Sequence, residues 1–283
     1  MMNAYLLRLE MLTDLHVGGE GGMGLVENEA QRDSVIQDVP IIPGSGVKGA
    51  LREHFAGKLA KEQEKLIFGY PPSQSKEGES SKPPPQSGDG KYKFFDAFCV
   101  ARPLRVSKGN HAYVLTTSVE IIEHFFSLML GVGFGNGTEI AAARKEIANL
   151  PWENSKFLCS PGAEIQSIEG ENAPETPTLA ENCPNLVAYI SKLIPKPWAI
   201  CQSLRPFDLP TRARNCLDDK KRNLWYEEYV PHKSIFYAPM LTPDEEKHLS
   251  FNEPVQFGAN GSVGMGYAKV TCLNTLDAGE NQP

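Results

Sequence analysis

The sequence has little of what builds a metal centre. Its six cysteines form no C-x-x-C pair, and none lies at metal-ligand spacing from a histidine. Zinc sites are built from such closely spaced ligands, so zinc is not expected. We interpret the cysteines as reduced thiols of a cytoplasmic protein. They occupy positions 99, 159, 183, 201, 216 and 272.

Long apolar runs and positive charge are also scarce. No stretch approaches the roughly 18 apolar residues of a membrane-spanning helix. Arg8 and Glu10 interrupt the apolar N-terminus, so we do not interpret it as a signal peptide. We therefore expect no membrane contact. The net charge is -7 and the pI about 5.5, whereas proteins that coat nucleic acid are usually basic. Any nucleic-acid site must be a local basic patch on an acidic surface.

A nucleotide-binding fingerprint is missing as well. The stretch from Gly44 to Lys48 is too short for a GxxxxGK[ST] loop. The glycine cluster at 131–137 follows a predicted helix, and the one at 258–266 leads into a predicted strand, so neither has the context of a dinucleotide site. We interpret both clusters as turns or close backbone approaches.

What is present is the composition of a globular protein. The chain has 283 residues, of which 41% are hydrophobic, and we expect one domain, 1–283, with insertions. The stretches 71–90 and 160–185 are polar and contain proline. Because 71–90 buries too little apolar surface to offset its ordering entropy, it is predicted to be a flexible loop insertion.

The order of hydrophobic periods predicts an α+β fold. Strand patterns occur at 4–13, 91–101 and within 254–273, and helical patterns occur at 45–68 and 117–130. Ser45 can cap the first helix and Gly69 can stop it. This order suggests an α+β sandwich of the ferredoxin-like, RNA-recognition-motif type, although periodicity alone does not distinguish it from other α+β folds.

The segment PIIPGSGVKGALR, residues 40–52, contains a candidate phosphate site. Its turn opens a helix whose unpaired N–H groups can bind an anion near Ser45. Lys48 and Arg52 lie one turn apart and place positive charge where a phosphate backbone could run. The alternative is a capped surface helix with two solvated cations, and spacing alone does not separate the two.

Several motifs in a fixed order resemble the RAMP superfamily of CRISPR proteins. They are LTDLHVGG at 12–19, IIPGSGVKGALR at 41–52, IFG at 67–69, FFDAF at 94–98 and GANGSVGMGYAKV at 258–270. Within the superfamily, AQRD at 30–33 and LWYEEYVPHKSIFY at 224–237 are most similar to the backbone subunits of type III-B Cmr effector complexes, with Csm backbone subunits as near relatives. The resemblance covers nearly the whole chain.

The resemblance implies an architecture and a set of partners. Such subunits have an RNA-recognition-motif palm and a thumb hairpin, and several copies stack in a helical filament along a guide RNA. Each thumb wedges into the guide–target duplex, and a nearby loop cuts the target RNA with help from a divalent metal, Mg or Mn. The implied partners are guide RNA, target RNA, further copies of the chain and other Cmr-type subunits.

The cutting loop of the family follows the first strand. Where the family has an aspartate, this chain has Glu27, which is the implied catalytic residue and metal ligand. Glutamate is one methylene longer, and a displacement of about 1 Å can lower a rate on the order of 100-fold. Glu29 and Asp33 are neighbouring carboxylates that could substitute.

Further catalytic candidates also follow from the resemblance. His16 matches a family histidine and could contact the scissile phosphate or transfer a proton. Glu227 and Tyr229, with Glu228 between them, lie in the segment that resembles the other part of the family's site. Without the resemblance, His16 is a hydrogen-bonded structural histidine and the glutamates are solvated carboxylates of a half-buried strand.

The predicted thumb is residues 203–233. Its positive charge comes from Arg205, Arg212, Arg214, Lys220, Lys221 and Arg222. Leu204, Phe207 and Leu209 are the apolar side chains expected to wedge against displaced bases. The alternative is an ordinary basic loop.

Two hypotheses for activity remain open at this stage. In one, the chain is a guide-bound ribonuclease in which the target's 2′-hydroxyl attacks the adjacent phosphorus, helped by Glu27 and His16. In the other, it is a binding scaffold of the same filament that has lost cleavage at Glu27. A third reading, a free-standing small-molecule enzyme with a phosphate site at Ser45, lacks any cofactor motif.

Overall fold

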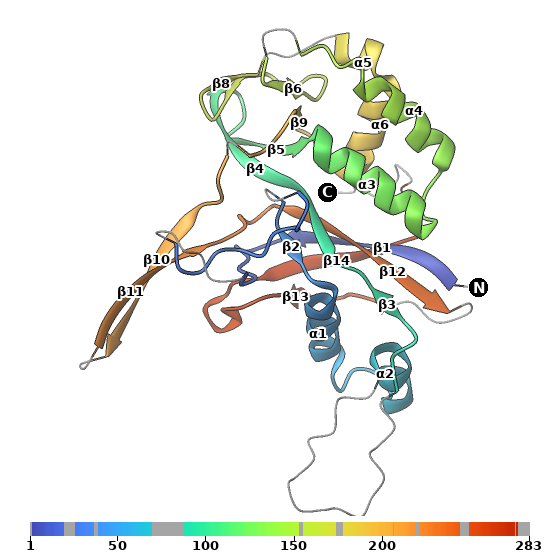
Figure 1. The fold of residues 1–283 in the computed structure, drawn as a ribbon, viewed down its shortest axis with the longest axis vertical. Helices are drawn as coiled ribbons and strands as arrows, with labels where there is room; N and C mark the ends of the chain where they lie inside the picture. Colours follow the sequence, from blue (N-terminus) through green and yellow to red (C-terminus); the bar gives the residue numbers. More distant parts are fainter. Residues whose placement is uncertain are drawn as a thin grey trace, which may run out of the picture.

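The fold is mixed α+β, as predicted, and consists of a large sheet, helices packed against it and a separate hairpin (Figure 1). The computed structural model describes residues 2–19, 26–36, 39–69, 88–152, 155–173, 178–205, 207–218, 221–243, 249–274 and 276. Of the predicted insertion at 71–90, only residues 88–90 belong to these ranges. The prediction that this insertion is flexible therefore concerns residues outside the described ranges.

The sheet follows the order β13-β14-β1-β12-β4-β5-β9-β6. These strands are β1 (Met2–Met11), β4 (Ala97–Gly109), β5 (Tyr113–Ser118), β6 (Phe157–Cys159), β9 (Trp198–Cys201), β12 (Ile235–Pro243), β13 (Val255–Gln256) and β14 (Tyr267–Leu273). Four further short strands pair with this sheet outside that order: β2 (Ile41–Ile42) and β7 (Ile165–Ile168) pair with β4, β3 (Lys93–Phe94) pairs with β12, and β8 (Glu171–Asn172) pairs with β7. β5 and β9 run parallel, whereas β1 is antiparallel to both of its neighbours.

β1 is the strand that leads into the candidate site. It pairs with β12 along residues 2–10 and with β14 along residues 6–11, which confirms the strand predicted near 4–13. Leu6 and Leu7 are both fully buried although their side chains alternate, so both faces of β1 are covered here. The chain therefore leaves β1 from a well-anchored position.

The helix predicted over 45–68 is in fact two helices, α1 (Gly44–Phe55) and α2 (Lys61–Phe68). Gly57 interrupts the pattern with a φ of 73°, a conformation that is inexpensive only for glycine. The predicted stop at Gly69 is confirmed, since this residue ends α2 with a φ of 74°. The apolar spacing at 47, 51 and 55 continues with Leu59 beyond the break, so the sequence pattern gives no sign that the helix ends.

A helical lobe lies above the sheet in Figure 1. It consists of α3 (Val119–Val132), α4 (Gly137–Ile147), α5 (Thr178–Asn182) and α6 (Pro184–Leu193). α3 confirms the helix predicted at 117–130; Ser118 Oγ caps it by accepting from Ile121 N–H at 3.3 Å, and Gly133 ends it in the left-handed conformation. The stretch 160–185 is more than a polar insertion, because it contains β7, β8 and α5 and buries Ile165, among others.

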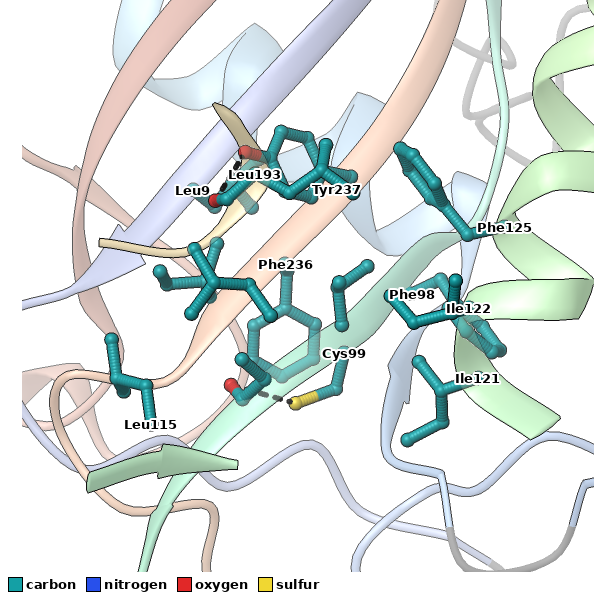
Figure 2. Close-up of a cluster of buried hydrophobic side chains, with 14 of the residues drawn as sticks. Leu9, Phe98, Cys99, Leu115, Ile121, Ile122, Phe125, Leu193, Phe236 and Tyr237 are labelled. Atoms are coloured by element: carbon teal, nitrogen blue, oxygen red, sulfur yellow. Dashed lines mark hydrogen bonds between the residues drawn. The ribbon is translucent and has the colours of Figure 1, made fainter. Parts of the chain in front are cut away.

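The core beneath this lobe is formed by side chains of β4, β12 and α3 (Figure 2). Phe98, Phe125, Phe236 and Tyr237 are nearly or fully buried, and each such side chain stabilises the fold by about 1.5–3 kcal/mol. Burial raises the pKa of Tyr237, whose hydroxyl donates to the Leu193 carbonyl at 2.8 Å. The packed β12 begins soon after the hairpin described next.

β10 (Thr211–Asp218) and β11 (Lys221–Glu228) form a two-stranded hairpin that extends away from the sheet (Figure 1). It lies within the range 203–233 predicted for the thumb. A two-stranded hairpin on its own is marginally stable in water. Its contacts with the body of the protein therefore decide where it points.

Candidate functional site

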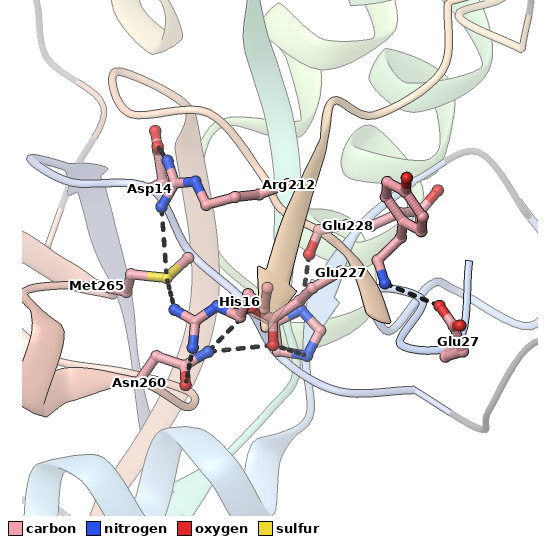
Figure 3. A network of polar contacts seen from close by, with 10 residues as sticks. Asp14, His16, Glu27, Arg212, Glu227, Glu228, Asn260 and Met265 are labelled. Atoms are coloured by element: carbon pink, nitrogen blue, oxygen red, sulfur yellow. Dashed lines mark hydrogen bonds and ion pairs between the residues drawn. The ribbon is translucent and has the colours of Figure 1, made fainter. Parts of the chain in front are cut away.

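The base of the hairpin carries two neighbouring carboxylates on opposite sides of β11. Glu227 and Glu228 are successive strand residues, so their side chains alternate. They are only 5% and 8% exposed. Buried carboxylates require partners, and each of these two has its own set. Figure 3 shows Glu227 with His16 and Asn260.

Glu227 is held from three directions. Arg214 Nε, on β10, forms an ion pair with its Oε2 at 2.9 Å. Asn260 Nδ2, from the glycine-rich loop at 258–266, donates to both carboxylate oxygens at 3.1 and 3.2 Å. His16 Nε2, from the segment after β1, lies 3.4 Å from Oε1. The carboxylate therefore joins three parts of the chain that are far apart in sequence.

Glu228 is held on the other side of β11 by the segment 30–33. Arg32 donates to its two oxygens at 2.8 and 3.0 Å, and the Ala30 N–H donates at 3.0 Å. The hydrogen bond to Glu228 raises the pKa of Arg32, with a smaller contribution from the nearby charge of Glu29. This two-pronged ion pair fixes the segment 30–33 against the hairpin.

His16 is enclosed, with 4% of its surface exposed. Its Nδ1 lies 2.7 Å from the carbonyl oxygen of Glu228, which can only accept, so Nδ1 carries a proton. Nε2 faces Glu227, and Gly258 packs so closely on the His16 backbone that a Cβ there would lie 2.3 Å from the His16 oxygen. In this conformation both ring nitrogens face the protein rather than a phosphate.

Glu27 is exposed and lies beside the hairpin. Its Oε2 accepts the Tyr226 N–H at 2.8 Å. Asn28 forms a parallel bridge with Glu227, so the segment 26–30 runs along β11. Asp33 does not join this segment's site, because its Oδ1 accepts the N–H groups of its own turn, at 2.7 and 2.8 Å.

The described residues do not fit the metal site expected at Glu27. No group of three or more His, Cys, Asp or Glu side chains in these ranges is arranged to hold an ion. The nearest buried carboxylates, Glu227 and Glu228, already pair with Arg214 and Arg32.

Arg212 and Tyr229 form a second contact at the hairpin base. The Arg212 guanidinium lies 4.8 Å from the Tyr229 ring centre and donates to Asp14 Oδ2 at 2.8 Å. Asp14 Oδ1 also accepts the His232 N–H at 3.0 Å. The side chain of Arg212 is still 44% exposed to solvent.

The start of α1 differs from the helix start predicted at Ser45. Ser45 is exposed but does not cap the helix, which begins one residue earlier; the Gly44 N–H instead donates to Asp96 Oδ1 at 2.7 Å. Arg52 donates to the carbonyl of Phe68 and so ties α1 to the end of α2. The anion site predicted at Ser45, Lys48 and Arg52 stays a prediction.

The apolar side chains predicted to wedge against displaced bases are packed inside the protein, so this prediction is wrong. Leu204 and Leu209 are 2% and 4% exposed, and Phe207 packs on Phe157 with ring centres 5.4 Å apart. Arg102, from β4, donates to the carbonyls of Leu204 and Phe207 and holds this stretch down. The residues expected to wedge therefore belong to the core.

The exposed apolar side chains of the hairpin are Leu224 and Tyr226, with 56% and 41% exposed. They share one face of β11, and their alternation with Glu227 was visible in the sequence. Arg205 is exposed. Lys220 and the side chains of Lys221 and Arg222 lie outside the described residues.

The fold and motifs are those of the RAMP superfamily, whose family model matches residues 8–269, and the chain belongs to this superfamily. Within it, the chain is related to Cmr4, the backbone subunit of type III-B Cmr complexes. It is 27% identical to the "CRISPR system Cmr endoribonuclease Cmr4" of Pyrococcus furiosus over 98% of both chains. It is 22% identical to the Cmr4 subunit of Saccharolobus solfataricus, over 94% of this chain and 95% of the other.

Solved structures share the fold at lower identity. A chain of the type III-B Cmr-beta complex bound to cognate target RNA superposes with a TM-score of 0.69 at 18% identity, covering 95% of this chain and 96% of the other. Oligomeric Cmr4 from Pyrococcus furiosus gives 0.63 at 20% identity, with coverages of 96% and 98%. Within the described ranges, no helix is long and apolar enough to cross a membrane.

Proposed function

We propose that this protein is an RNA-binding backbone subunit of a type III CRISPR effector complex in the cytoplasm. It binds guide RNA and target RNA, stacks with further copies of itself and contacts other Cmr-type subunits. The observation that carries the proposal is the projecting hairpin, which presents Leu224 and Tyr226 on one face and the exposed cation Arg212 on the other. Exposed aromatic and apolar side chains can stack on unpaired bases, and a cation can pair with phosphates.

The palm is proposed to be ferredoxin-like, within one RAMP-type domain. Four neighbouring strands, β14, β1, β12 and β4, are antiparallel, and α3 packs on two of them. Such a palm supports RNA on its surface in RNA-recognition motifs. Lys48 on α1 supplies a second phosphate contact away from the hairpin.

The test is RNA binding by the full chain and two matched variants. Tyr226→Ala should weaken binding of a guide–target RNA duplex on the order of tenfold, because stacking of one base on an aromatic ring is worth about 1–3 kcal/mol. Tyr113→Ala removes a tyrosine of similar exposure, 36%, away from the hairpin and should leave binding within about twofold. A wild-type protein that copurifies without RNA and binds none when RNA is added would refute the proposal.

As a second function we propose cleavage of the target RNA. It is supported by the exposed Glu27 beside the hairpin and by a relative that is named an endoribonuclease. The target's 2′-oxygen would bond to the adjacent phosphorus as the P–O5′ bond breaks; Glu27 would accept the 2′-hydroxyl proton, and water would protonate the leaving 5′-oxygen. The product would carry a 2′,3′-cyclic phosphate.

This second function is tested on the assembled complex with guide and complementary RNA. Magnesium, manganese and EDTA reactions run in parallel report any metal requirement. A complementary DNA strand, which lacks the 2′-hydroxyl, should remain intact. Intact RNA in all three reactions would leave the protein a binding subunit without cleavage.

A further inference from the structure

The contacts of Arg214 differ from those of Arg212, the other cation of the hairpin whose side chain the structure describes. Its side chain is only 23% exposed, and its Nε pairs with Glu227 at 2.9 Å. Its Nη1 donates to Asn260 Oδ1 at 3.0 Å, and its Nη2 lies 3.4 Å from the sulfur of Met265. Every nitrogen of this guanidinium therefore faces a group of the protein, which leaves little of it for a phosphate.

Asn260 contacts both Arg214 and Glu227, and its backbone adopts an uncommon conformation. Its φ of 65° lies in the left-handed region, which asparagine tolerates better than most residues. From there its amide nitrogen reaches both oxygens of Glu227, and its amide oxygen accepts from Arg214. A backbone that is strained at this point is maintained by contacts rather than by local preference.

The same loop is bound to the palm as well as to the hairpin. The Ala259 N–H donates to the His16 carbonyl at 2.8 Å, and Gly258, with a φ of 69°, allows the close approach. Glu227 and Asn260 are thus the points at which the hairpin meets a loop that is itself fixed to the end of β1. Arg32 and the Ala30 N–H hold β11 at Glu228, and Glu27 holds it at Tyr226, whereas Glu227 and Asn260 fix the side of the hairpin that faces the glycine-rich loop. A two-stranded hairpin depends on such contacts for its direction.

We propose that Arg214, Glu227 and Asn260 form a latch that positions the β10–β11 hairpin against the glycine-rich loop. They are positioning residues, and Arg214 is not a phosphate contact. The proposal rests on the proposed RNA binding, because the latch fixes the spacing between the exposed face of the hairpin and the palm. RNA then meets a preorganised surface instead of having to order it.

Two variants test the latch in the free protein, independently of RNA. Arg214→Gln removes the ion pair, and Asn260→Gly removes the side chain while keeping the left-handed backbone available. Each should raise amide hydrogen exchange of β10 and β11 at least several-fold over wild type. The control Arg105→Gln changes an arginine that is 76% exposed and should not alter it. Wild-type exchange in both latch variants would overturn the proposal.

The salt dependence of RNA binding separates a latch from a phosphate contact. With a labelled single-stranded RNA of mixed sequence, Arg214→Gln should weaken binding about tenfold and leave the slope of log Kd against log salt unchanged. A slope lowered by about one would identify a lost phosphate contact and overturn the latch. Asn260→Gly changes no charge and should weaken binding with the wild-type slope; it also serves if Arg214→Gln fails to fold.

The combination of the two substitutions gives a last check. If both act through one latch, the double variant should lose little more affinity than Arg214→Gln alone. Additive losses would mean that the residues act separately, which the proposal excludes. If wild-type protein binds no RNA, the proposed function fails, while the hydrogen-exchange result still decides whether the latch exists.

Discussion

The carboxylate of Glu27 accepts the backbone N–H of Tyr226 at 2.8 Å. This bond connects the segment implied in cutting to the exposed tyrosine of the hairpin. The longer side chain of glutamate makes the contact, and aspartate at this position would be one methylene shorter. Glutamate in place of the family's aspartate is therefore matched by a hydrogen bond between Glu27 and the hairpin.

Substitutions at Glu27 should separate its charge from its hydrogen bond. Glu27→Gln keeps an oxygen that can accept the Tyr226 N–H but cannot take up a proton. If cleavage occurs as proposed, this variant and Glu27→Ala should both lose it, by about 100-fold or more. Cleavage assays on the assembled complex provide the measurement, with Glu29→Gln as the control on the same segment. Retained cleavage in Glu27→Gln would assign Glu27 to positioning alone.

Arg212 is expected to contact phosphate, unlike Arg214 two residues away on the same face of β10. Arg212→Gln should lower the salt slope of RNA binding by about one and weaken binding similarly for all sequences. Kd values measured by anisotropy at several salt concentrations check this. An unchanged slope would mean that its pairing with Asp14, at 2.8 Å, is its whole role.

The glycine-rich loop offers a matched pair of glycines, both with positive φ. Gly258→Ala should destabilise the protein more than Gly264→Ala, because a Cβ at 258 meets the His16 carbonyl oxygen at 2.3 Å while one at 264 meets nothing within 4 Å. Strain of about 1–2 kcal/mol is expected at both positions. Urea unfolding measures the difference, and equal losses would show that the loop moves away from His16 at little cost.

Cys99 should make stability fall at alkaline pH. Burial raises the pKa of this thiol from 9.0 to about 12, so the folded state holds the proton more tightly than the unfolded state does. Its contribution is complete below pH 9 and is lost as the pH rises toward 12. Cys99→Ala should remove up to about 1.4 kcal/mol per pH unit of that loss. The buried control Val114→Ala should keep the wild-type dependence, and identical slopes in wild type and Cys99→Ala would contradict the assignment.

Local patterns predicted much of the fold. The alternation near 4–13 and the helical spacing at 117–130 identified β1 and α3, because each depends on neighbours in sequence. The break at Gly57 could not be predicted in this way, because the apolar spacing on either side remains compatible with one helix. The assignment to the superfamily depended on the order of the sequence motifs. Hydrophobic periodicity and charge alone do not distinguish this superfamily from other α+β proteins.

The contacts of the site could not be read from the sequence. Glu227 meets His16 and Asn260 across separations that only the folded chain closes. In sequence, the pair Glu227 and Glu228 has the appearance of solvated strand carboxylates, and Leu209 that of a surface wedge. Long-range pairing and burial decide both cases, and neither leaves a local period.

The two carboxylates at the hairpin base also fix the position of β11 relative to its partners. A slip of β11 by one residue would place Tyr226 or Tyr229 where one of the glutamates stands, and Arg32 or Arg214 would lose its counter-ion. Both glutamates lie at the end of β11 that leads to β12, so the register is fixed where the hairpin leaves the palm. Residues inserted between Asp218 and Lys221 should therefore change the reach of the hairpin, while its origin on the palm stays where it is.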